Sequence, residues 1–161
     1  MQEGLKFRGA LPGGASSNFV TEEHLDTRMD FASMKKVRSH LGTGTVIVLD
    51  DGNCPVGMLL NLQRFFSRES CGWCTPCREG LPWIVQMLEA LEEGSGTAQD
   101  IELLETHTKL LDTGNTFCTL APAAMFSLES ALRHFREDFG EHVKLKRCKF
   151  KSSGVGESRH F

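Results

Sequence analysis

Three cysteines lie within seven residues near the middle of the chain, at Cys71, Cys74 and Cys77. This C-x2-C-x2-C spacing is the one by which ferredoxin-like loops wrap an iron–sulfur cube. A cube has four irons, and each iron needs a thiolate that arrives from a different direction. Gaps of two residues let one loop curl around three corners, and Gly72 relieves the backbone crowding that this curl creates. The fourth corner must come from elsewhere in the fold.

Three further cysteines are candidates for the fourth corner: Cys54, Cys118 and Cys148. Cys54 borders a predicted strand turn, which favours a buried structural role, and Cys148 lies in a basic segment, which favours an ordinary free thiol. The sequence therefore favours Cys118, while its spacing alone leaves the other two as alternatives.

Two other kinds of site compete with an iron–sulfur cluster. Four thiolates also suit tetrahedral zinc, although zinc sites more often use two separated C-x2-C pairs. A thioredoxin-like dithiol would need a βαβ pattern around it and only two cysteines. Crowded thiols in a chain without an export signal indicate metal binding or redox chemistry in a reducing compartment.

A helix is predicted to start within the cysteine triplet. Thr75 can serve as its N-cap and Pro76 as its first residue, so Cys77 is expected in the first turn. There a thiolate benefits from the positive end of the helix dipole. Arg78 could raise the potential of a cluster by offsetting its negative charge, or could be an exposed arginine at a helix start. Trp73 could shield a cluster or could simply pack.

Four amphipathic helices are predicted after residue 55, and helices of this length joined by short connections can pack as a bundle. The second helix contains Pro82, so it is expected to kink there or to begin afresh after Gly80. Thr97 and Asp100 resemble a capping box that opens the third helix. The predicted segments are 56–69, 76–93, the residues after Thr97, and a last helix with Pro122 near its start and Met125, Leu128, Leu132, Phe135 and Phe139 on one face.

The first third of the chain is predicted to be a small mixed unit of strands and one short helix. Residues 5–11 have the spacing of a half-buried strand, and residues 45–49 form a β-branched run. Between them, Asp30 suits the N-cap of a helix over 31–41. Together with the helices that follow, this region predicts a fold of the α+β class.

Composition narrows the classes of function. The chain has 161 residues with 18 Lys and Arg against 21 Asp and Glu, and the net charge of −3 argues against nucleic acid as a partner. Its apolar runs are far too short to cross a bilayer, so no direct membrane insertion is expected. Residues 144–161 carry six basic side chains and one acidic one. They predict a flexible basic tail, solvated or docked on an acidic partner.

Four segments resemble one known family. Residues 69–80, ESCGWCTPCREG, resemble a signature of the NADH-binding flavoprotein subunit (the F subunit) of bacterial respiratory complex I. Residues 116–118 resemble the later segment that holds that family's fourth cysteine, and residues 134–139 resemble the helix after it. Residues 12–16, PGGAS, resemble the glycine turn of its soluble-ligand-binding β-grasp module. The resemblance covers about residues 5–143.

The resemblance implies a 4Fe-4S cluster and a specific set of ligands, namely Cys71, Cys74, Cys77 and Cys118. It also implies two parts of the chain, a β-grasp (soluble-ligand-binding type) domain over 1–54 and a four-helix bundle that carries the cluster over 55–143. The basic tail over 144–161, which the charge distribution predicts, follows them.

The function that the resemblance implies is electron transfer in an NADH-quinone oxidoreductase. In that family NADH reduces FMN, and electrons then pass through this cluster to another iron–sulfur protein of the complex. The expected partners are subunits of the peripheral arm of complex I, including an iron–sulfur subunit, and the expected location is cytoplasmic, peripheral to the inner membrane. The glycine-rich FMN and NADH domain has no counterpart here, since Gly42-Thr43-Gly44 precedes a predicted strand. FMN and NADH are therefore expected to bind outside this chain, which alone should not oxidise NADH.

The sequence leaves alternatives open for the parent enzyme and for the class of protein. The chain is expected to be a C-terminal fragment, or else another polypeptide supplies the flavin half. The same signature occurs in diaphorase subunits of NAD-linked hydrogenases and formate dehydrogenases. A zinc-stapled interaction module is the alternative from a different class of protein.

Overall fold

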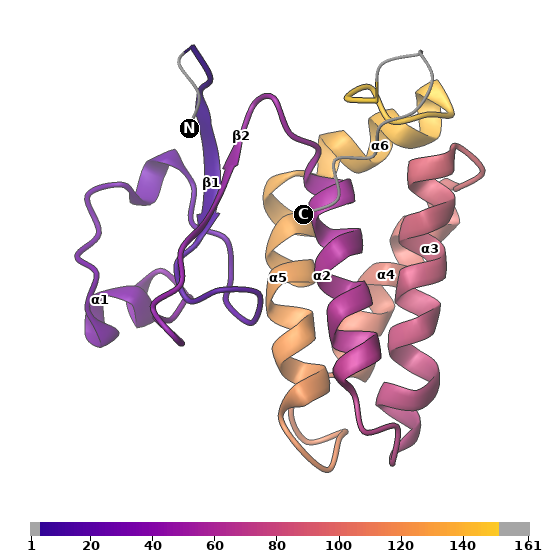
Figure 1. Cartoon of the computed structure of the whole chain (residues 1–161), viewed down its shortest axis with the longest axis horizontal. Helices are drawn as coiled ribbons and strands as arrows, with labels where there is room; N and C mark the ends of the chain where they lie inside the picture. Colours follow the sequence, from indigo (N-terminus) through magenta and orange to yellow (C-terminus); the bar gives the residue numbers. More distant parts are fainter. Residues whose placement is uncertain (1–3, 152–161) are drawn as a thin grey trace.

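A two-stranded antiparallel sheet forms the first part of the computed structural model, which describes residues 4–151 (Figure 1). Strand β1 (Phe7–Leu11) pairs with strand β2 (Ile47–Asp50), and a further bridge joins Ala10 to Val20. Both strands overlap the predicted ranges, because apolar alternation and β-branched residues suit a half-buried extended backbone.

Short helical segments fill the connection between the two strands. Helix α1 (Phe31–Lys36) begins where the sequence predicts, since the Asp30 carboxylate accepts a hydrogen bond from the Ser33 N–H at 2.8 Å. It ends five residues before the predicted end at 41, because Arg38 adopts a left-handed backbone with φ 57°. The other helical element of this region is the 3-10 helix η1 (Glu22–His24).

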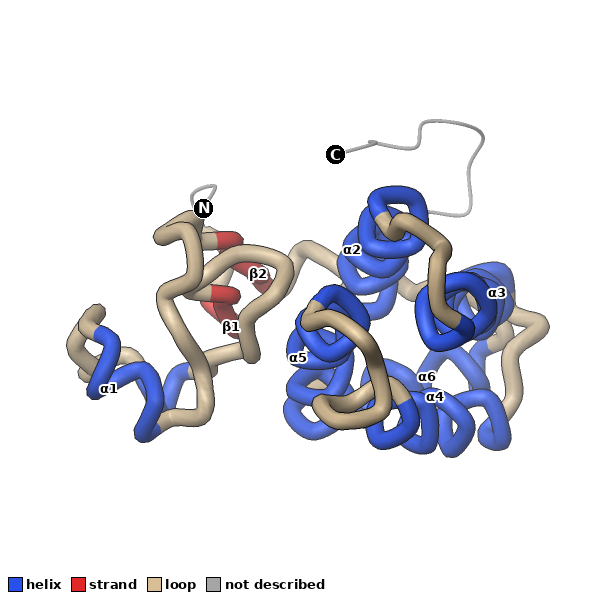
Figure 2. The backbone as a smooth tube through the Cα atoms, turned by 90° about the horizontal axis from the view of Figure 1, so that it is seen from below, coloured by secondary structure: helices blue, strands red, loops and turns tan. Residues whose placement is uncertain are grey.

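Within residues 4–151, five α-helices follow the sheet, and four of them run side by side as a bundle (Figures 1 and 2). Their bounds are α2 (Pro55–Glu69), α3 (Leu81–Glu93), α4 (Ala98–Leu110), α5 (Leu120–His134) and α6 (Arg136–Leu145). Helix α6 contacts each of the other four and crosses the end of the bundle at which α2 begins. The core is apolar, with fully buried side chains from every helix of the bundle, including Leu59, Leu81, Ile84, Leu88, Leu104, Leu128 and Phe139.

The capping box that opens α4 is confirmed. The Thr97 N–H donates to the Asp100 carboxylate at 2.7 Å, and the Asp100 N–H donates back to the Thr97 hydroxyl at 3.4 Å. These two bonds satisfy backbone donors that have no partner within the helix.

The prediction of one unbroken last helix is wrong, because the helix is interrupted at Phe135, between α5 and α6. The apolar repeat continues through this residue, so the periodicity carries no sign of the break. The Phe135 ring packs edge-on against Phe19 at a centroid distance of 5.1 Å. The Phe19 N–H also donates to the Ser130 hydroxyl at 2.9 Å. Contact with the sheet region therefore accompanies the break in the helix.

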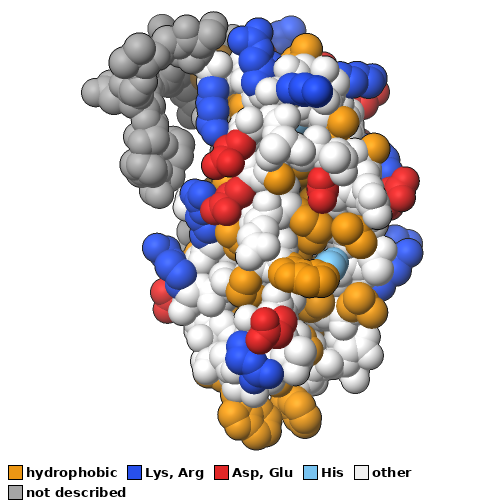
Figure 3. Space-filling view, turned by 90° about the vertical axis from the view of Figure 1, so that its right-hand side faces the viewer, with side chains coloured by type: hydrophobic (Ala, Val, Ile, Leu, Met, Phe, Trp, Pro, Cys, Tyr) orange, Lys and Arg blue, Asp and Glu red, His pale blue; other side chains and the backbone are white. Residues whose placement is uncertain are grey.

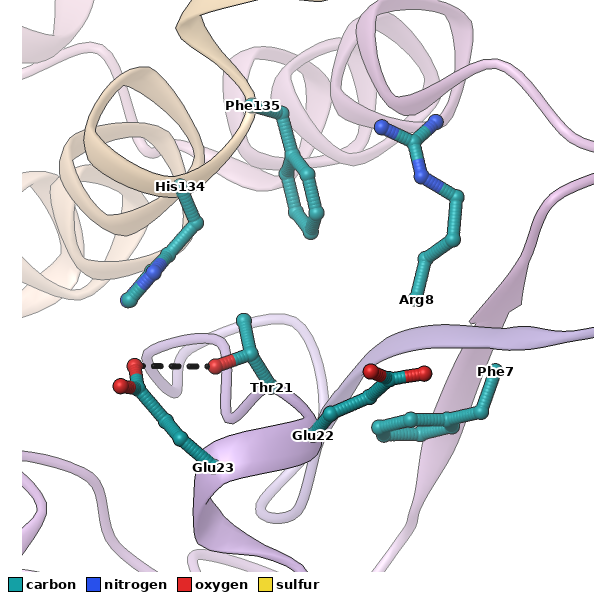
Figure 4. A pocket seen from close by; sticks show the side chains of 7 residues that line it. All are labelled: Phe7, Arg8, Thr21, Glu22, Glu23, His134 and Phe135. Carbon is teal, nitrogen blue, oxygen red and sulfur yellow. Dashed lines mark hydrogen bonds between the residues drawn. The ribbon is translucent and has the colours of Figure 1, made fainter.

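An ion pair joins the sheet region to the bundle at the same place. The Arg8 guanidinium contacts both carboxylate oxygens of Asp138, at 2.5 and 3.2 Å, and lies over the Phe135 ring. An open cleft of about 350 Å³ lies beside Arg8. In Figure 4, Thr21 and Glu23 lie on the side of this cleft opposite Arg8 and Phe135. Within the described residues, no helix is both long and apolar enough to cross a membrane.

Candidate functional site

The cysteine triplet lies in the connection between α2 and α3, at the lower end of the bundle in Figure 1. Cys71 is exposed, whereas Cys74 and Cys77 are buried. The loop turns sharply at Gly72, which has φ +67° and open space where a side chain would be. The Gly72 N–H donates to the Ser70 hydroxyl at 3.0 Å, and this bond holds the turn.

The helix that follows starts as a wide π-helical turn, η2 (Pro76–Gly80), which runs directly into α3. Pro76 is its first residue and Cys77 lies in its first turn, as predicted. The predicted capping role of Thr75 is wrong, because its backbone is already helical and its side chain makes no capping hydrogen bond. Helix α3 begins directly after Gly80, which is one of the two outcomes that the sequence predicts for Pro82. Pro82 lacks an N–H, and the wider π turn just before it accommodates this missing donor.

Arg78 holds the cysteine loop together, a role that neither interpretation of the sequence included. Its half-exposed guanidinium donates to the carbonyls of Gly72 and Trp73 at 3.4 and 3.3 Å. Its backbone N–H donates to the Cys74 carbonyl at 3.0 Å. These bonds tie the start of η2 to the loop that precedes it.

Cys118 lies in the connection between α4 and α5, at the same end of the bundle as the triplet. The Trp73 ring packs against the Phe117 ring at a centroid distance of 5.2 Å, which places the two loops side by side. Burial raises the pKa of the Cys77 thiol, and the nearby thiols of Cys74 and Cys118 add to that rise. The structure thus brings the segment around Cys118 to the triplet.

The aromatic pair at this end is exposed. Trp73 and Phe117 are 73% and 80% exposed, so Trp73 packs against another surface residue and is not a buried shield. Figure 3 shows apolar side chains gathered at the lower tip of the bundle. The tip therefore offers an apolar surface next to the cysteines.

Cys54 and Cys148 lie far from the triplet. Cys54 is the N-cap of α2, and the triplet follows the other end of that 15-residue helix, which is about 22 Å long. Cys148 is buried, and its ligand atom lies within 4.8 Å of that of Cys54. The structure therefore separates these two cysteines from the other four.

Four cysteines around one end of the bundle have a clear chemical preference. Thiolates are soft donors that select zinc or iron–sulfur clusters over magnesium and calcium. Buried Cys74 and Cys77, exposed Cys71 and Cys118, and an open left-handed turn at Gly72 form a partly open cradle. These residues fit a thiolate-bound iron–sulfur cluster.

Known proteins resemble this chain in sequence and in structure. Residues 57–142 match the family described as the NADH-ubiquinone oxidoreductase-F iron-sulfur binding region. The F subunit of NADH-quinone oxidoreductase from Escherichia coli (strain K12) is 50% identical over 144 residues, which are 89% of this chain and 32% of that protein. The protein of the same name from Buchnera aphidicola subsp. Baizongia pistaciae is 46% identical over 160 residues, 98% of this chain and 36% of the relative.

A solved structure shares the fold. A chain of an NAD+-reducing [NiFe]-hydrogenase in the H2-reduced state superposes with a TM-score of 0.73 at 26% identity, over 88% of this chain and 23% of that chain. This chain spans about a third of the length of the curated relatives named above.

Proposed function

Because this chain belongs to the family of the NADH-ubiquinone oxidoreductase-F iron-sulfur binding region, we propose that it is an electron-relay module of an NADH-oxidising enzyme. Cys71, Cys74, Cys77 and Cys118 are the proposed ligands of a 4Fe-4S cluster. The observation that carries this proposal is the meeting of the triplet loop with the segment around Cys118 at one end of the bundle. All four cysteines lie within the matched residues 57–142.

The residues of this chain position and insulate the site. When bound, a 4Fe-4S cluster accepts and passes on single electrons, and the protein sets its position and environment. Ser70 and Arg78 hold the loop in its curled form through the bonds to Gly72 and Trp73. Cys77 lies in the first helical turn, close to the positive end of the helix dipole.

The electron donor and acceptor are assigned from the relatives. Both named relatives are F subunits of NADH-quinone oxidoreductases, so the proposed path runs from NADH through FMN to this cluster. FMN and NADH bind outside this chain in this proposal. The proposed acceptor is another iron–sulfur subunit of the peripheral arm of complex I, on the cytoplasmic side and peripheral to the inner membrane. The exposed pair Trp73 and Phe117 beside the cysteines supports docking of that subunit at the tip.

The proposed domain division follows the same family. Residues 1–54 are a β-grasp domain of the soluble-ligand-binding type, 55–143 are the four-helix bundle with the cluster, and 144–161 are a basic tail. The antiparallel pair β1 and β2 and the side-by-side packing of α2 to α5 support the first two parts. Within the described part of the third, Lys144 and Leu145 complete α6.

A diaphorase subunit of a hydrogenase is the second candidate. The structural similarity to the NAD+-reducing [NiFe]-hydrogenase supports it, since the shared fold has a TM-score of 0.73. Identity favours the first candidate, because it reaches 50% with the Escherichia coli NADH-quinone oxidoreductase protein and 26% with the hydrogenase chain.

Metal and sulfide analysis tests the proposal. Protein purified without air should be brown and should contain about four irons and four sulfides per chain. Cys118→Ala should lose or degrade the cluster, whereas Cys148→Ala, at the other end of the bundle, should retain its iron. Zinc bound by four sulfurs without any sulfide would instead support the zinc-stapled interaction module.

A further inference from the structure

A second group of metal-ligating side chains lies at the upper end of the bundle in Figure 1, where α2 begins and α3 ends. Its members come from four separate segments of the chain. Cys54 precedes α2, Glu92 is near the end of α3, His142 is on α6, and Cys148 follows α6. One ligand atom from each lies within 4.8 Å of all the others.

The separations within this group suit a tetrahedral ion. The His142 Nε2 is 3.1 Å from the Glu92 Oε1 and 3.5 Å from the Cys54 Sγ, and the Cys54 Sγ is 3.1 Å from the Glu92 Oε1. Metal–ligand bonds of about 2.0–2.3 Å give a tetrahedron with edges of about 3.3–3.8 Å. A shift of a few tenths of an ångström would therefore give these three side chains the spacing of such a tetrahedron, and the ligand atom of Cys148 lies within 4.8 Å of each of them.

His142 is oriented as metal-bound histidines usually are. Its Nδ1 lies 2.7 Å from the backbone carbonyl of Asp138. A carbonyl can only accept, so Nδ1 carries a proton, and Nε2 is the ring nitrogen that faces the other three side chains. Such a bond from the second nitrogen fixes the tautomer and the ring orientation of a ligating histidine.

The other members also have supporting contacts. The Gly57 N–H donates to the Cys54 Sγ at 3.3 Å, and this bond orients the sulfur at the N-cap of α2. Lys151 Nζ lies 2.9 Å from the Glu92 Oε2, the oxygen that faces away from the group. One carboxylate oxygen is thus neutralised by a lysine while the other remains for a ligand.

Three of the four side chains are buried, Cys54 is partly exposed, and the last segment of the group packs closely on the bundle. Glu92, His142 and Cys148 are 5%, 1% and 2% exposed. The chain after α6 passes so close to Gly94 that a side chain there would collide with the Lys146 carbonyl. This close contact places Cys148 over the end of α3.

We propose that Cys54, Glu92, His142 and Cys148 form a structural Zn2+ site. Two thiolates, one imidazole and one carboxylate are a donor set that selects zinc over magnesium or calcium. Four protein ligands leave no open position, which is typical of structural rather than catalytic zinc. The ion would join the starts and ends of helices that are distant in sequence, and would fix the segment 146–151 on the bundle.

Zinc X-ray absorption of the whole chain tests this site directly. The protein is purified without air, dialysed against a chelator and loaded with one equivalent of Zn2+. We expect about one zinc per chain with two sulfurs at about 2.3 Å and two nitrogen or oxygen ligands at about 2.0–2.1 Å. Zinc in the cysteine triplet would show four sulfurs, so the two ends of the bundle are distinguished.

Matched variants sharpen the test. Cys148→Ser and the isosteric Glu92→Gln should each weaken zinc binding by more than about 100-fold, since even supporting residues outside the ligand set change metal affinity 10–100-fold. Their iron content should be unchanged. Cys118→Ser is the control at the other end, and it should keep the zinc affinity of the unmodified chain while losing iron. If the cluster proposal is wrong, the iron and sulfide contents will show it. If the zinc proposal is wrong, the zinc affinity and the zinc ligands will show it.

Several results would overturn the zinc site. These are no zinc bound at micromolar concentration, zinc coordinated by four sulfurs, zinc affinity unaffected by Glu92→Gln and Cys148→Ser, or iron in place of zinc at this end. A disulfide between Cys54 and Cys148 in protein kept free of air, seen by mass spectrometry without reductant, would also overturn it.

Discussion

The two ends of the helix bundle each gather cysteines, but they do so in opposite ways. At the lower end, three cysteines come from seven consecutive residues of one loop. At the upper end, the four side chains are spread from Cys54 to Cys148 and meet only because α2, α3 and α6 converge. A site built by one loop has a spacing that the sequence displays, whereas a site built by tertiary packing has none.

The two ends also differ in their access to solvent. Cys71 and Cys118 are exposed beside an exposed aromatic pair, which suits a site that a partner protein must approach. Three of the four side chains of the upper group are buried, and its carboxylate forms an ion pair with Lys151. The lower end thus suits exchange of electrons with a partner, and the upper end suits a closed structural role.

The largest expected effect separates the two ends completely. Cys77→Ser should remove practically all iron and sulfide, because Cys77 is a buried ligand in the proposed set and sits in the first turn that shapes the loop. Zinc content should stay unchanged. Iron, sulfide and zinc measured on the same anaerobic sample check this. Loss of both metals together would show that the two ends are not independent.

Gly94→Ala should damage only the upper end. Gly94 has φ +84°, and an added carbon would meet the Lys146 carbonyl, so the segment that holds Cys148 must move away. We expect a loss of about 1–3 kcal/mol in the free energy of unfolding, measured in urea, and weaker zinc binding with iron retained.

Gly44→Ala is the matched control for this prediction. Gly44 also has a positive φ, +75°, but nothing lies within 4 Å of an added carbon. It should cost about 1 kcal/mol of conformational strain and leave zinc binding intact. Equal effects of the two substitutions would mean that the close approach to Lys146 contributes nothing to the upper site.

A substitution between the sheet region and the bundle should spare both ends. Arg8→Met removes the partner of the Asp138 carboxylate, which is 5% exposed on its side chain. Lys149 remains 3.5 Å from that carboxylate. We therefore expect the free energy of unfolding to fall by about 1–2 kcal/mol, which is less than for a fully unpaired buried charge. Thermal unfolding measures this loss, and a change in iron or zinc content would contradict the assignment of a purely connecting role.

The sequence predicts the local features of this fold well and the tertiary ones poorly. The Asp30 cap, the capping box at Thr97 and the β-branched strand are all confirmed, since each depends on neighbouring residues. The break at Phe135 could not be predicted, because it coincides with packing against Phe19, more than a hundred residues away.

The two candidate sites differ in the same way, because the sequence predicts the lower one and not the upper one. The triplet is evident from its spacing, and Cys118 is reached through the family resemblance. Cys148, which its basic surroundings mark as an ordinary free thiol, is buried beside Cys54. Glu92 and His142 carry no signal in the sequence, since a single acidic residue and a single histidine on helices are common.

The smallest expected effect concerns Arg78 and separates charge from loop geometry at the lower end. A nearby positive charge stabilises the more negative, reduced form of a cluster, so Arg78→Ala should make its midpoint potential more negative. The guanidinium is half exposed, and an exposed charge interaction of about 0.2–1 kcal/mol corresponds to about 10–40 mV for one electron. Redox titration of samples with full iron content measures the shift.

Arg78→Lys and Arg64→Ala complete this comparison. Arg78→Lys keeps the charge but lacks the planar fork that reaches the carbonyls of Gly72 and Trp73, so an unchanged potential would assign the effect to charge. Equal shifts in the lysine and alanine variants would assign it to loop geometry instead. Arg64 pairs with Glu89 on the side of the bundle, and its removal should leave the potential in place. If neither change at Arg78 moves the potential, then Arg78 only ties the loop, and the potential depends on the cysteines and their burial.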